Sequence, residues 1–381
     1  MTYLCWLIRK IRKQKANWIP LIFVLIFLGL LYGGSWKSAQ FALEDPIGNG
    51  TQELEQVDKS IEYFEQELDK DTLEDSAYEV LMGDLDTARM RKDVLEKRLQ
   101  AMQDKNWQRY YFYDHMYHQM AISALMQEEA ENKEVIEALS IDQAYDQYQR
   151  EHEQSFDNRY ANVQGVSFLI SASQMILPFI LSFVLIFIVS VLCNSCYENR
   201  LFIHGLIPGH KITKQIQLLM AETVISLFLA VIVCMFCLLL GAACMTLGNG
   251  DTPIRIYGQA KLFQPVSTVF IQWCITGFLS ILFLSCLVSL VSYGIRNTLG
   301  TIGVCSLLIL GGIWISEHIV PLFSVIHLFP STYFQSLKVI SGQMTHITGN
   351  TNIDFMHGMW VLITGCVILF GLRMILERKR G

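Results

Sequence analysis

The run VSTVFIQWCITGFLSILFLSCLVSLVSY, from Val266 to Tyr293, contains no Asp, Glu, Lys or Arg. A soluble core helix does not need so long an apolar stretch, whereas a helix that crosses a bilayer needs about 20 apolar residues. Hydrophobic residues make up 52% of the 381-residue chain, which therefore predicts an all-α membrane protein with six transmembrane helices. The other five apolar runs are Trp18 to Gly34, Val166 to Cys193, Ile216 to Leu247, Leu299 to Ile315 and Gly358 to Ile375.

The charged residues form two populations of opposite sign. Residues 35–163, between the first two apolar runs, hold 29 acidic and 13 basic residues, whereas the rest of the chain holds 6 acidic and 16 basic ones. The net charge of -6 is thus the sum of -16 and +10. We expect the two parts to face different environments.

The basic residues predict the orientation, because positively charged flanks of membrane spans stay in the cytoplasm. The loops assigned to the outside carry only Arg255, Lys261 and Lys338, apart from residues 35–163. We therefore predict a multi-pass protein of the cell membrane with both termini cytoplasmic and residues 35–163 extracellular. The thirteen basic residues assigned to the inside are Arg9, Lys10, Arg12, Lys13, Lys15, Arg200, Lys211, Lys214, Arg296, Arg373, Arg378, Lys379 and Arg380.

The N-terminal residues 1–17 combine a helical apolar spacing with a basic cluster. Leu4, Leu7, Ile8 and Ile11 recur at this spacing, which predicts a cytoplasmic helix in the membrane interface, in contact with lipid. The alternative is a disordered basic leader. Residues 18–34 form the first span, which we expect to stay uncleaved, since it is longer than a signal-peptide core and ends without a small-x-small site.

The acidic segment, residues 35–163, is long enough for a helical extracellular domain. Apolar residues at three-four spacing predict helices over 54–68 and 78–102, the second broken by Lys92. The stretch DKDTLEDS between them predicts a turn and hence an antiparallel hairpin. Further helices are predicted from Trp107 to about Asn132 and from Glu134 to Gln149, with no β-structure of consequence.

Motifs for catalysis and metal binding are missing from the sequence. It contains no nucleophile elbow, no HExxH and no phosphate-binding GxxxxGK[ST], which predicts no catalytic residues and no cofactor on this chain. His115 and His118 lie one helical turn apart, but no third ligand follows at a recognisable spacing, so we predict no metal site. The acidic domain also argues against nucleic acid as a partner.

The polar stretch CYENRLFIHGLIPGHKITKQI, Cys196 to Ile216, lies between the second and third apolar runs. Residues 197–206 have the composition of a short amphipathic helix, which Pro208 and Gly209 then break. Such a helix in a cytoplasmic loop can dock in a groove of a soluble partner, or it can simply face lipid while the chain turns around. The residues themselves leave these two interpretations even.

The chain resembles an ATP-binding-cassette (ABC) exporter permease of the type-two permease class. In that class the second span is followed by an acidic residue, a short coupling helix, a Leu-Pro-like pair and a basic residue. Here Glu198, the apolar stretch, Ile207-Pro208 and Lys211 match this order. The segment HLFPSTYF, His327 to Phe334, resembles the part of such permeases that dips back toward the membrane before the last span. No form of the class with a helical insert like residues 35–163 is apparent.

The resemblance implies five spans within residues 164–381, a coupling-helix loop at 194–215 and a re-entrant segment at 318–345. It also implies a transport subunit paired with a second permease subunit and with separate ABC ATPase subunits that bind ATP and Mg. The apolar spans favour an amphipathic or hydrophobic cargo, such as a peptide. The residues implied in ATPase coupling are Glu198, Arg200, Leu201, Phe202, Leu206, Pro208 and Lys211.

One charge inside an apolar run is costly and predicts a role. Glu222 lies about two turns into the third span from the cytoplasmic side, where Arg296 or Arg373 can pair with it. We expect a structural ion pair there, or a hinge that rearranges during transport. A different class of function remains open: a membrane receptor or secretion-accessory scaffold that uses the acidic helical domain.

Overall fold

The computed structural model describes residues 18–70, 75–127, 132–153, 162–195, 197–198, 201–202, 211–259 and 261–380. Six helices in it are long and apolar enough to cross a membrane, as the sequence predicts. These segments are Ile19–Gln40, Leu177–Asn194, Ile212–Cys244, Val266–Ile295, Thr298–His318 and Phe355–Arg378. The predicted interfacial helix at residues 1–17 lies outside the described residues.

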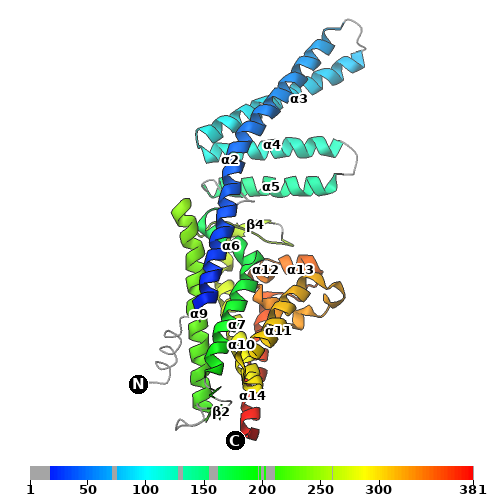
Figure 1. Ribbon diagram of the computed structural model, residues 1–381. Coiled ribbons are helices and arrows are strands. Elements are labelled where there is room, and N and C mark those ends of the chain that lie inside the picture. The colour runs from blue at the N-terminus through cyan, green and yellow to red at the C-terminus, as the bar shows by residue number, and fades with distance from the viewer. Residues whose placement is uncertain are drawn as a thin grey trace.

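The first span is part of one long helix, α2, Ile19–Leu68. Its 50 residues correspond to about 75 Å, so α2 runs from the membrane bundle to the far tip of the molecule (Figure 1). The prediction of a span ending at Gly34 and a separate helix starting near residue 54 is therefore wrong. The contacts where α2 leaves the bundle favour continuity: the Tyr32 hydroxyl donates to the Val163 carbonyl at 2.9 Å, and Ala39 packs on Val163.

The segment after α2 forms the predicted helical domain at one end of the bundle (Figure 1). α3, Asp75–Gln103, packs on α2 as the predicted hairpin partner, and α4, Trp107–Gln127, and α5, Lys133–Glu151, follow. Gly50 permits the close approach of α2 and α3, because a Cβ there would lie 2.7 Å from Leu99 Cδ2. Lys92, which interrupts the apolar repeat of α3, instead reaches Asp58 of α2 at 2.6 Å.

The first part of α2 packs with the remaining five spans in the bundle, and the first of these five is broken. α6, Gly165–Met175, and α7, Leu177–Asn194, meet at Ile176 instead of forming the continuous helix that the run from Val166 predicts. Pro178 explains the break, because proline lacks an N–H donor and its ring clashes with the preceding turn. The other spans are α9, Lys211–Cys244, α10, Val266–Ile295, α11, Thr298–His318, and α14, Phe355–Arg380.

Short elements fill the loops at both ends of the bundle. One hairpin pairs β1, Tyr197–Glu198, with β2, Leu201–Phe202, and a second pairs β3, Pro253–Arg255, with β4, Phe263–Pro265. Between α11 and α14 lie η2, Val320–Leu322, η3, Ile326–Leu328, η4, Pro330–Phe334, α12, Ser336–Ile340, and α13, Gln343–Thr348.

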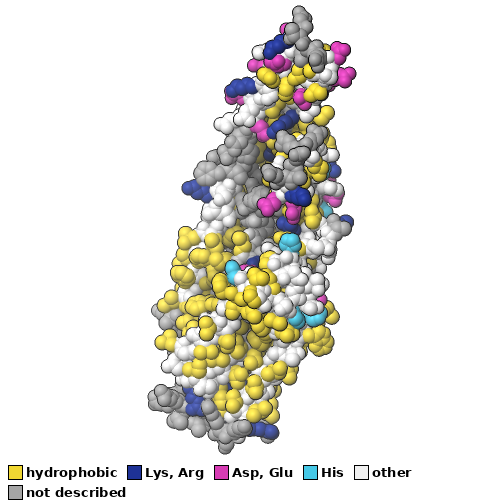
Figure 2. Space-filling model, turned by 90° about the vertical axis from the view of Figure 1, so that its right-hand side faces the viewer, with side chains coloured by type: hydrophobic (Ala, Val, Ile, Leu, Met, Phe, Trp, Pro, Cys, Tyr) yellow, Lys and Arg dark blue, Asp and Glu magenta, His cyan; other side chains and the backbone are white. Residues whose placement is uncertain are grey.

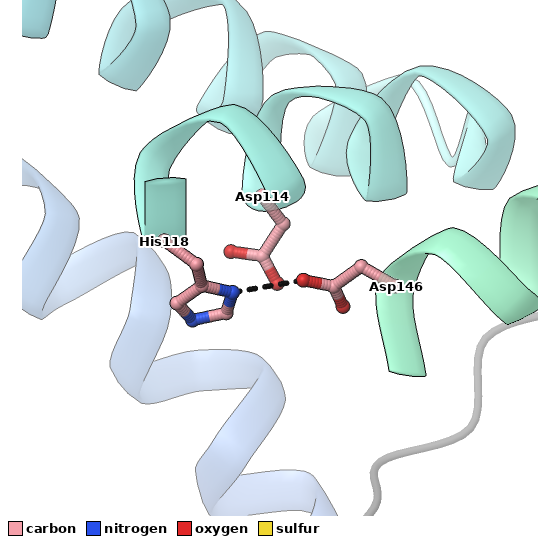
Figure 3. Close-up of side chains that lie close together, drawn as sticks. All are labelled: Asp114, His118 and Asp146. Atoms are coloured by element: carbon pink, nitrogen blue, oxygen red, sulfur yellow. Dashed lines mark hydrogen bonds and ion pairs between the residues drawn. The ribbon is translucent and has the colours of Figure 1, made fainter. Parts of the chain in front are cut away.

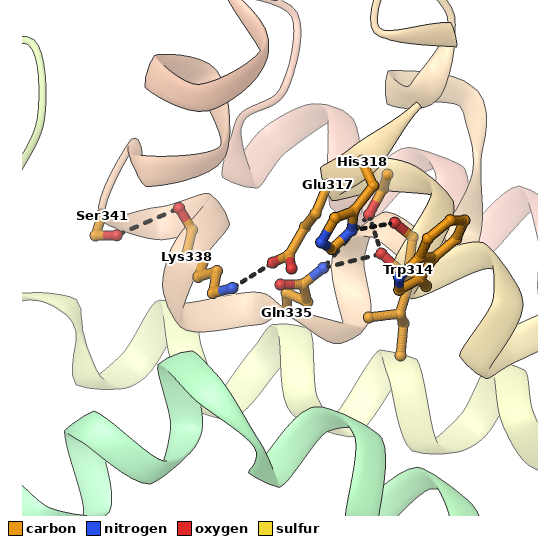
Figure 4. Close-up of polar contacts among 8 residues, drawn as sticks. Trp314, Glu317, His318, Gln335, Lys338 and Ser341 are labelled. Atoms are coloured by element: carbon orange, nitrogen blue, oxygen red, sulfur yellow. Dashed lines mark hydrogen bonds and ion pairs between the residues drawn. The ribbon is translucent and has the colours of Figure 1, made fainter. Parts of the chain in front are cut away.

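The segment between α11 and α14 is held firmly on α11 (Figure 4). The Gln335 amide donates to Ser316 Oγ at 3.3 Å, and the Lys338 ammonium pairs with the Glu317 carboxylate. Tyr333 is fully buried between the helices. A packed, largely helical excursion before the last span fits the re-entrant prediction, while its depth in a bilayer stays a prediction.

The surface divides as the charge pattern predicts. Figure 2 shows hydrophobic side chains over the bundle and Asp, Glu, Lys and Arg gathered over the α2–α5 domain. Large apolar side chains on the bundle point outward, among them Leu307 at 75% exposure and Phe23 at 69%. So extensive an exposed apolar surface is what a lipid-embedded bundle presents.

Candidate functional site

The loop between α7 and α9 holds the residues that the sequence assigns to ATPase coupling. β1 and β2 pair antiparallel there, with Tyr197 opposite Phe202 and Glu198 opposite Leu201. A helix that begins at Tyr197 is therefore wrong for these four residues. In the sequence, Asn199 and Arg200 separate the two paired segments, and Asn between two such segments is a hairpin signal that the apolar pattern concealed.

Of the other predicted coupling residues, the structure describes Lys211, which is the first residue of α9. Arg200, Leu206 and Pro208 lie outside the described residues. The β1–β2 hairpin and the C-terminal end of α14 lie at one end of the molecule, and the α3–α5 domain lies at the other (Figure 1).

A buried polar contact joins the two helices that flank this loop. Glu222, on α9, is fully buried, and the Cys193 thiol, in the last turn of α7, donates to Glu222 Oε1 at 2.9 Å. α9 also packs against α6 and α10. The Cys193–Glu222 contact therefore links α7 directly to α9.

The two arginines predicted to pair with Glu222 gather around one aromatic ring. Arg373, on α14, is 4% exposed, donates from Nη1 to the Ser289 carbonyl at 3.0 Å and places its Cζ 4.1 Å from the Tyr293 ring centroid. Arg296 lies 5.9 Å from the same centroid. Among the described residues, no ion pair of 4.0 Å or less joins Glu222 to either arginine.

These contacts tie α10 to α14 near the same end of the bundle. The Tyr293 hydroxyl donates to the Leu376 carbonyl at 3.3 Å, about one turn before α14 ends. A small cavity of about 10 Å³ lies between α9, α10 and α14, where Gln215 and Arg373 are among the lining residues. Both polar side-chain atoms of Gln215 are buried without a hydrogen-bond partner in the described part of the chain. The polar groups of four spans thus converge where the predicted coupling loop enters the bundle.

A second polar cluster lies in the α2–α5 domain (Figure 3). His118 Nδ1, on α4, lies 2.8 Å from Asp146 Oδ2, on α5, and Asp114 lies one turn before His118. Arg98 of α3 places Nε 2.8 Å from Asp114 Oδ1 and its guanidinium over the Tyr117 ring. The cluster therefore ties three helices of the domain together through buried charges.

Burial and neighbouring charges shift the titration of this cluster. Burial raises the pKa of Asp146 to about 7, and the hydrogen bond from His118 only partly opposes that rise. Burial acts to lower the pKa of His118, but the bond to Asp146 and the nearby Asp114 carboxylate outweigh it, so that the pKa is raised. The pair is arranged to hold a shared proton near neutral pH.

The same three residues are the donors closest to a metal-ligand arrangement. Asp114, His118 and Asp146 each offer one ligand atom, all within 4.8 Å of one another. Sequence reasoning missed Asp146 as the third donor because it lies on the next helix, and it paired His118 with His115, which instead contacts the Gln143 carbonyl at 3.1 Å. Arg98 already supplies a cation to Asp114, so the geometry favours a charge network over a metal centre.

The fold and the polar clusters define a helical, multi-pass membrane protein with no catalytic constellation among its described residues. The comparison with known families is more specific: the sequence matches the family described as ABC-2 family transporter protein over residues 18–375. The chain belongs to this family and is the membrane permease component of an ABC-2 type transporter. No curated protein and no solved structure is significantly similar to it. The match extends across the α2–α5 domain and does not favour a receptor or scaffold function.

Proposed function

We propose that the chain is the permease subunit of an ABC exporter, assembled from two such membrane subunits and two separate ATPase subunits. ATP and Mg would be bound by the ATPases. The single observation that carries this proposal is the position of the α7–α9 loop, which enters the bundle where Cys193 joins α7 to the buried Glu222 of α9. A force applied to that loop reaches the packed core directly.

The orientation is proposed from charge. The end of the bundle with the β1–β2 hairpin and the α14 terminus carries the basic flanks, and such flanks stay in the cytoplasm. The acidic α2–α5 domain is then extracellular. ATPase subunits, which work on cytoplasmic ATP, would meet the chain at the hairpin end.

The cargo we propose is amphipathic or hydrophobic, with a cationic peptide as the first choice. An acidic extracellular domain attracts a cationic cargo electrostatically. An apolar groove of about 780 Å³ between α2 and α7 offers a surface for the hydrophobic part of such a molecule. Its lining is almost wholly aliphatic and aromatic and includes Phe23, Phe27, Phe179 and Phe183.

The experiment purifies the tagged chain in mild detergent from cells that make its native partners and identifies the proteins that co-purify. Leu201 and Phe202 are then changed together to aspartate. The matched control is Leu247→Asp, three residues beyond the opposite end of α9, where the side chain is 52% exposed. We expect an ATPase subunit to co-purify with the native chain and the control and to be lost from the double variant.

Two outcomes contradict this proposal. One is the absence of any ATPase subunit from the native preparation. The other is an ATPase subunit that stays bound when Leu201 and Phe202 are aspartate. A further variant, Cys193→Ala, separates docking from coupling, because it removes the α7–α9 hydrogen bond and leaves the β1–β2 hairpin sequence unchanged. It should retain the ATPase subunit while reducing cargo-stimulated ATP hydrolysis.

A further inference from the structure

A polar cavity lies where the α2–α5 domain meets the bundle. It measures about 190 Å³ and is enclosed by α5, α6 and the β3–β4 hairpin. The hairpin is held against α5 by the Tyr145 and Phe263 rings, whose centroids are 5.4 Å apart, and by the Tyr148 hydroxyl, which donates to the Asp251 carbonyl at 2.8 Å. The cavity walls are therefore built from packed elements.

Arg255, at the end of β3, is the cation of this cavity. Its guanidinium stacks on Tyr257, with Cζ 4.4 Å from the ring centroid. Its Nε atom is buried and has no hydrogen-bond partner among the described residues, and none of their carboxylates lies within ion-pair distance. Arg255 itself is half-buried, and burial of its Nε without an acceptor is costly, so this position favours an anion.

Lys338 provides an internal comparison, since it is another basic residue of the loops at this end of the bundle. The Lys338 side chain is 11% exposed, and its ammonium pairs with the Glu317 carboxylate (Figure 4). At Lys338 the protein itself therefore supplies the carboxylate that neutralises the buried cation. The polar side chains of α6 that line the cavity with Arg255 are neutral: Ser167, whose hydroxyl now donates to the Gln164 carbonyl at 3.1 Å, Ser171 and Gln174.

The position of the cavity along the molecule, between the apolar bundle and the charged domain, indicates which anion binds there. On its bundle side lies an apolar cluster in which Ile170, Ile254 and Val266 are buried together, and on its other side begins the charged α2–α5 domain. This boundary is where a phospholipid presents its phosphate to a membrane protein. Guanidinium and hydroxyl donors together suit the tetrahedral oxygens of a phosphate.

We propose that this cavity binds a phosphate group, carried by a phospholipid headgroup or present as free phosphate, with Arg255 as its counter-cation. Arg255 donates from the guanidinium fork, Ser167, Ser171 and Gln174 complete the donor set, and Tyr257 holds the guanidinium plane. A bound headgroup would brace the β3–β4 hairpin between α5 and α6.

Calorimetric titration of the purified, delipidated full chain tests the proposal with three probes. Dihexanoyl phosphatidylglycerol supplies the headgroup, dihexanoylglycerol has the same acyl chains without phosphate, and inorganic phosphate represents the free ion. The variants are Arg255→Gln, Arg255→Lys and the matched control Lys261→Gln, which removes an exposed positive charge from the same hairpin connection. Thermal unfolding of each variant checks that it is folded.

We expect saturable binding of phosphatidylglycerol that Arg255→Gln weakens roughly tenfold or more, because a charge-assisted hydrogen bond is lost. Lys261→Gln should bind like the native chain, and Arg255→Lys should lie between, since it keeps the charge but loses the fork. If Arg255→Gln does not fold, the Lys variant carries the comparison.

The two sources of phosphate are separated by the probes. Binding of phosphatidylglycerol without inorganic phosphate assigns the headgroup, and Arg255-dependent binding of inorganic phosphate assigns the free ion. The proposal is overturned if neither phosphate binds, if dihexanoylglycerol binds as tightly as phosphatidylglycerol, or if the Arg255 variants bind like the native chain.

Discussion

Replacing Gly241 with alanine should separate α6 from α9, because these helices touch at their backbones. A Cβ at position 241 would lie 2.2 Å from the Gly165 nitrogen and 2.3 Å from its Cα, well inside the closest approach of real side chains. The obstruction is backbone on both sides, so no rotamer change relieves it. The two helices must move apart by the better part of an ångström or more.

The magnitude follows from what that movement breaks. Overpacking of a tight contact costs about 1–3 kcal/mol. The same movement pulls on two backbone hydrogen bonds, from Gly165 N to the Thr246 carbonyl at 3.0 Å and from Val166 N to the Leu247 carbonyl at 2.9 Å. Each contributes about 0.5–1.5 kcal/mol. The expected loss is therefore roughly 2–6 kcal/mol of folding free energy.

The assay is the thermal midpoint of the purified chain in detergent, followed by size-exclusion chromatography after heating. The matched control is Gly277→Ala in α10, where a Cβ meets nothing within 4 Å and alanine is the better helix former. Gly241→Ala should lower the midpoint by several degrees, and Gly277→Ala should leave it unchanged or raise it. Equal midpoints for the two variants would refute the close α6–α9 contact.

Two further predictions concern buried charge. Asp146 and His118 both have raised pKa values in the folded domain, so the folded state binds more protons than the unfolded one. Stability should therefore fall as pH rises from 3.8, the ordinary pKa of an Asp, through about 7, the pKa of folded Asp146. Asp146→Asn should flatten that profile in thermal unfolding, and an unchanged slope would contradict the assignment. Lys338→Met leaves Glu317 buried without its cation and should cost roughly 3 kcal/mol in thermal unfolding. Adding Glu317→Gln should restore most of it, and a double variant no more stable than Lys338→Met would count against the pair.

Composition and periodicity were sufficient for the number of apolar spans and for α4 and α5, because hydrophobic length and spacing are local properties. They did not predict the continuity of α2 or the break between α6 and α7. Composition and periodicity were also insufficient where the same residues can form either a helix or a strand. The four residues of β1 and β2 have a pattern that suits a short amphipathic helix, but cross-strand pairing decides their conformation.

The candidate sites show the same division more sharply. Glu222 was recognisable from the sequence, because a carboxylate in an apolar run is costly wherever it lies. Its partner was not, since Cys193 is 29 residues away and looks like any small apolar residue of a span. Asp146 could not be assigned to His118 for a similar reason: one helix face meets another only when the domain is packed.

The sequence by itself determined that this protein has six segments long and apolar enough to cross a membrane, because length and apolar composition are local properties of the chain. It also determined which segment is acidic and therefore lies apart from the bundle. Only the tertiary structure decided that α2 continues from the bundle into the acidic domain, that Glu222 meets a thiol, and that Arg255 lines a cavity whose described lining residues include no carboxylate. Those outcomes depend on which distant side chains come within contact distance, and local pattern carries no information about that.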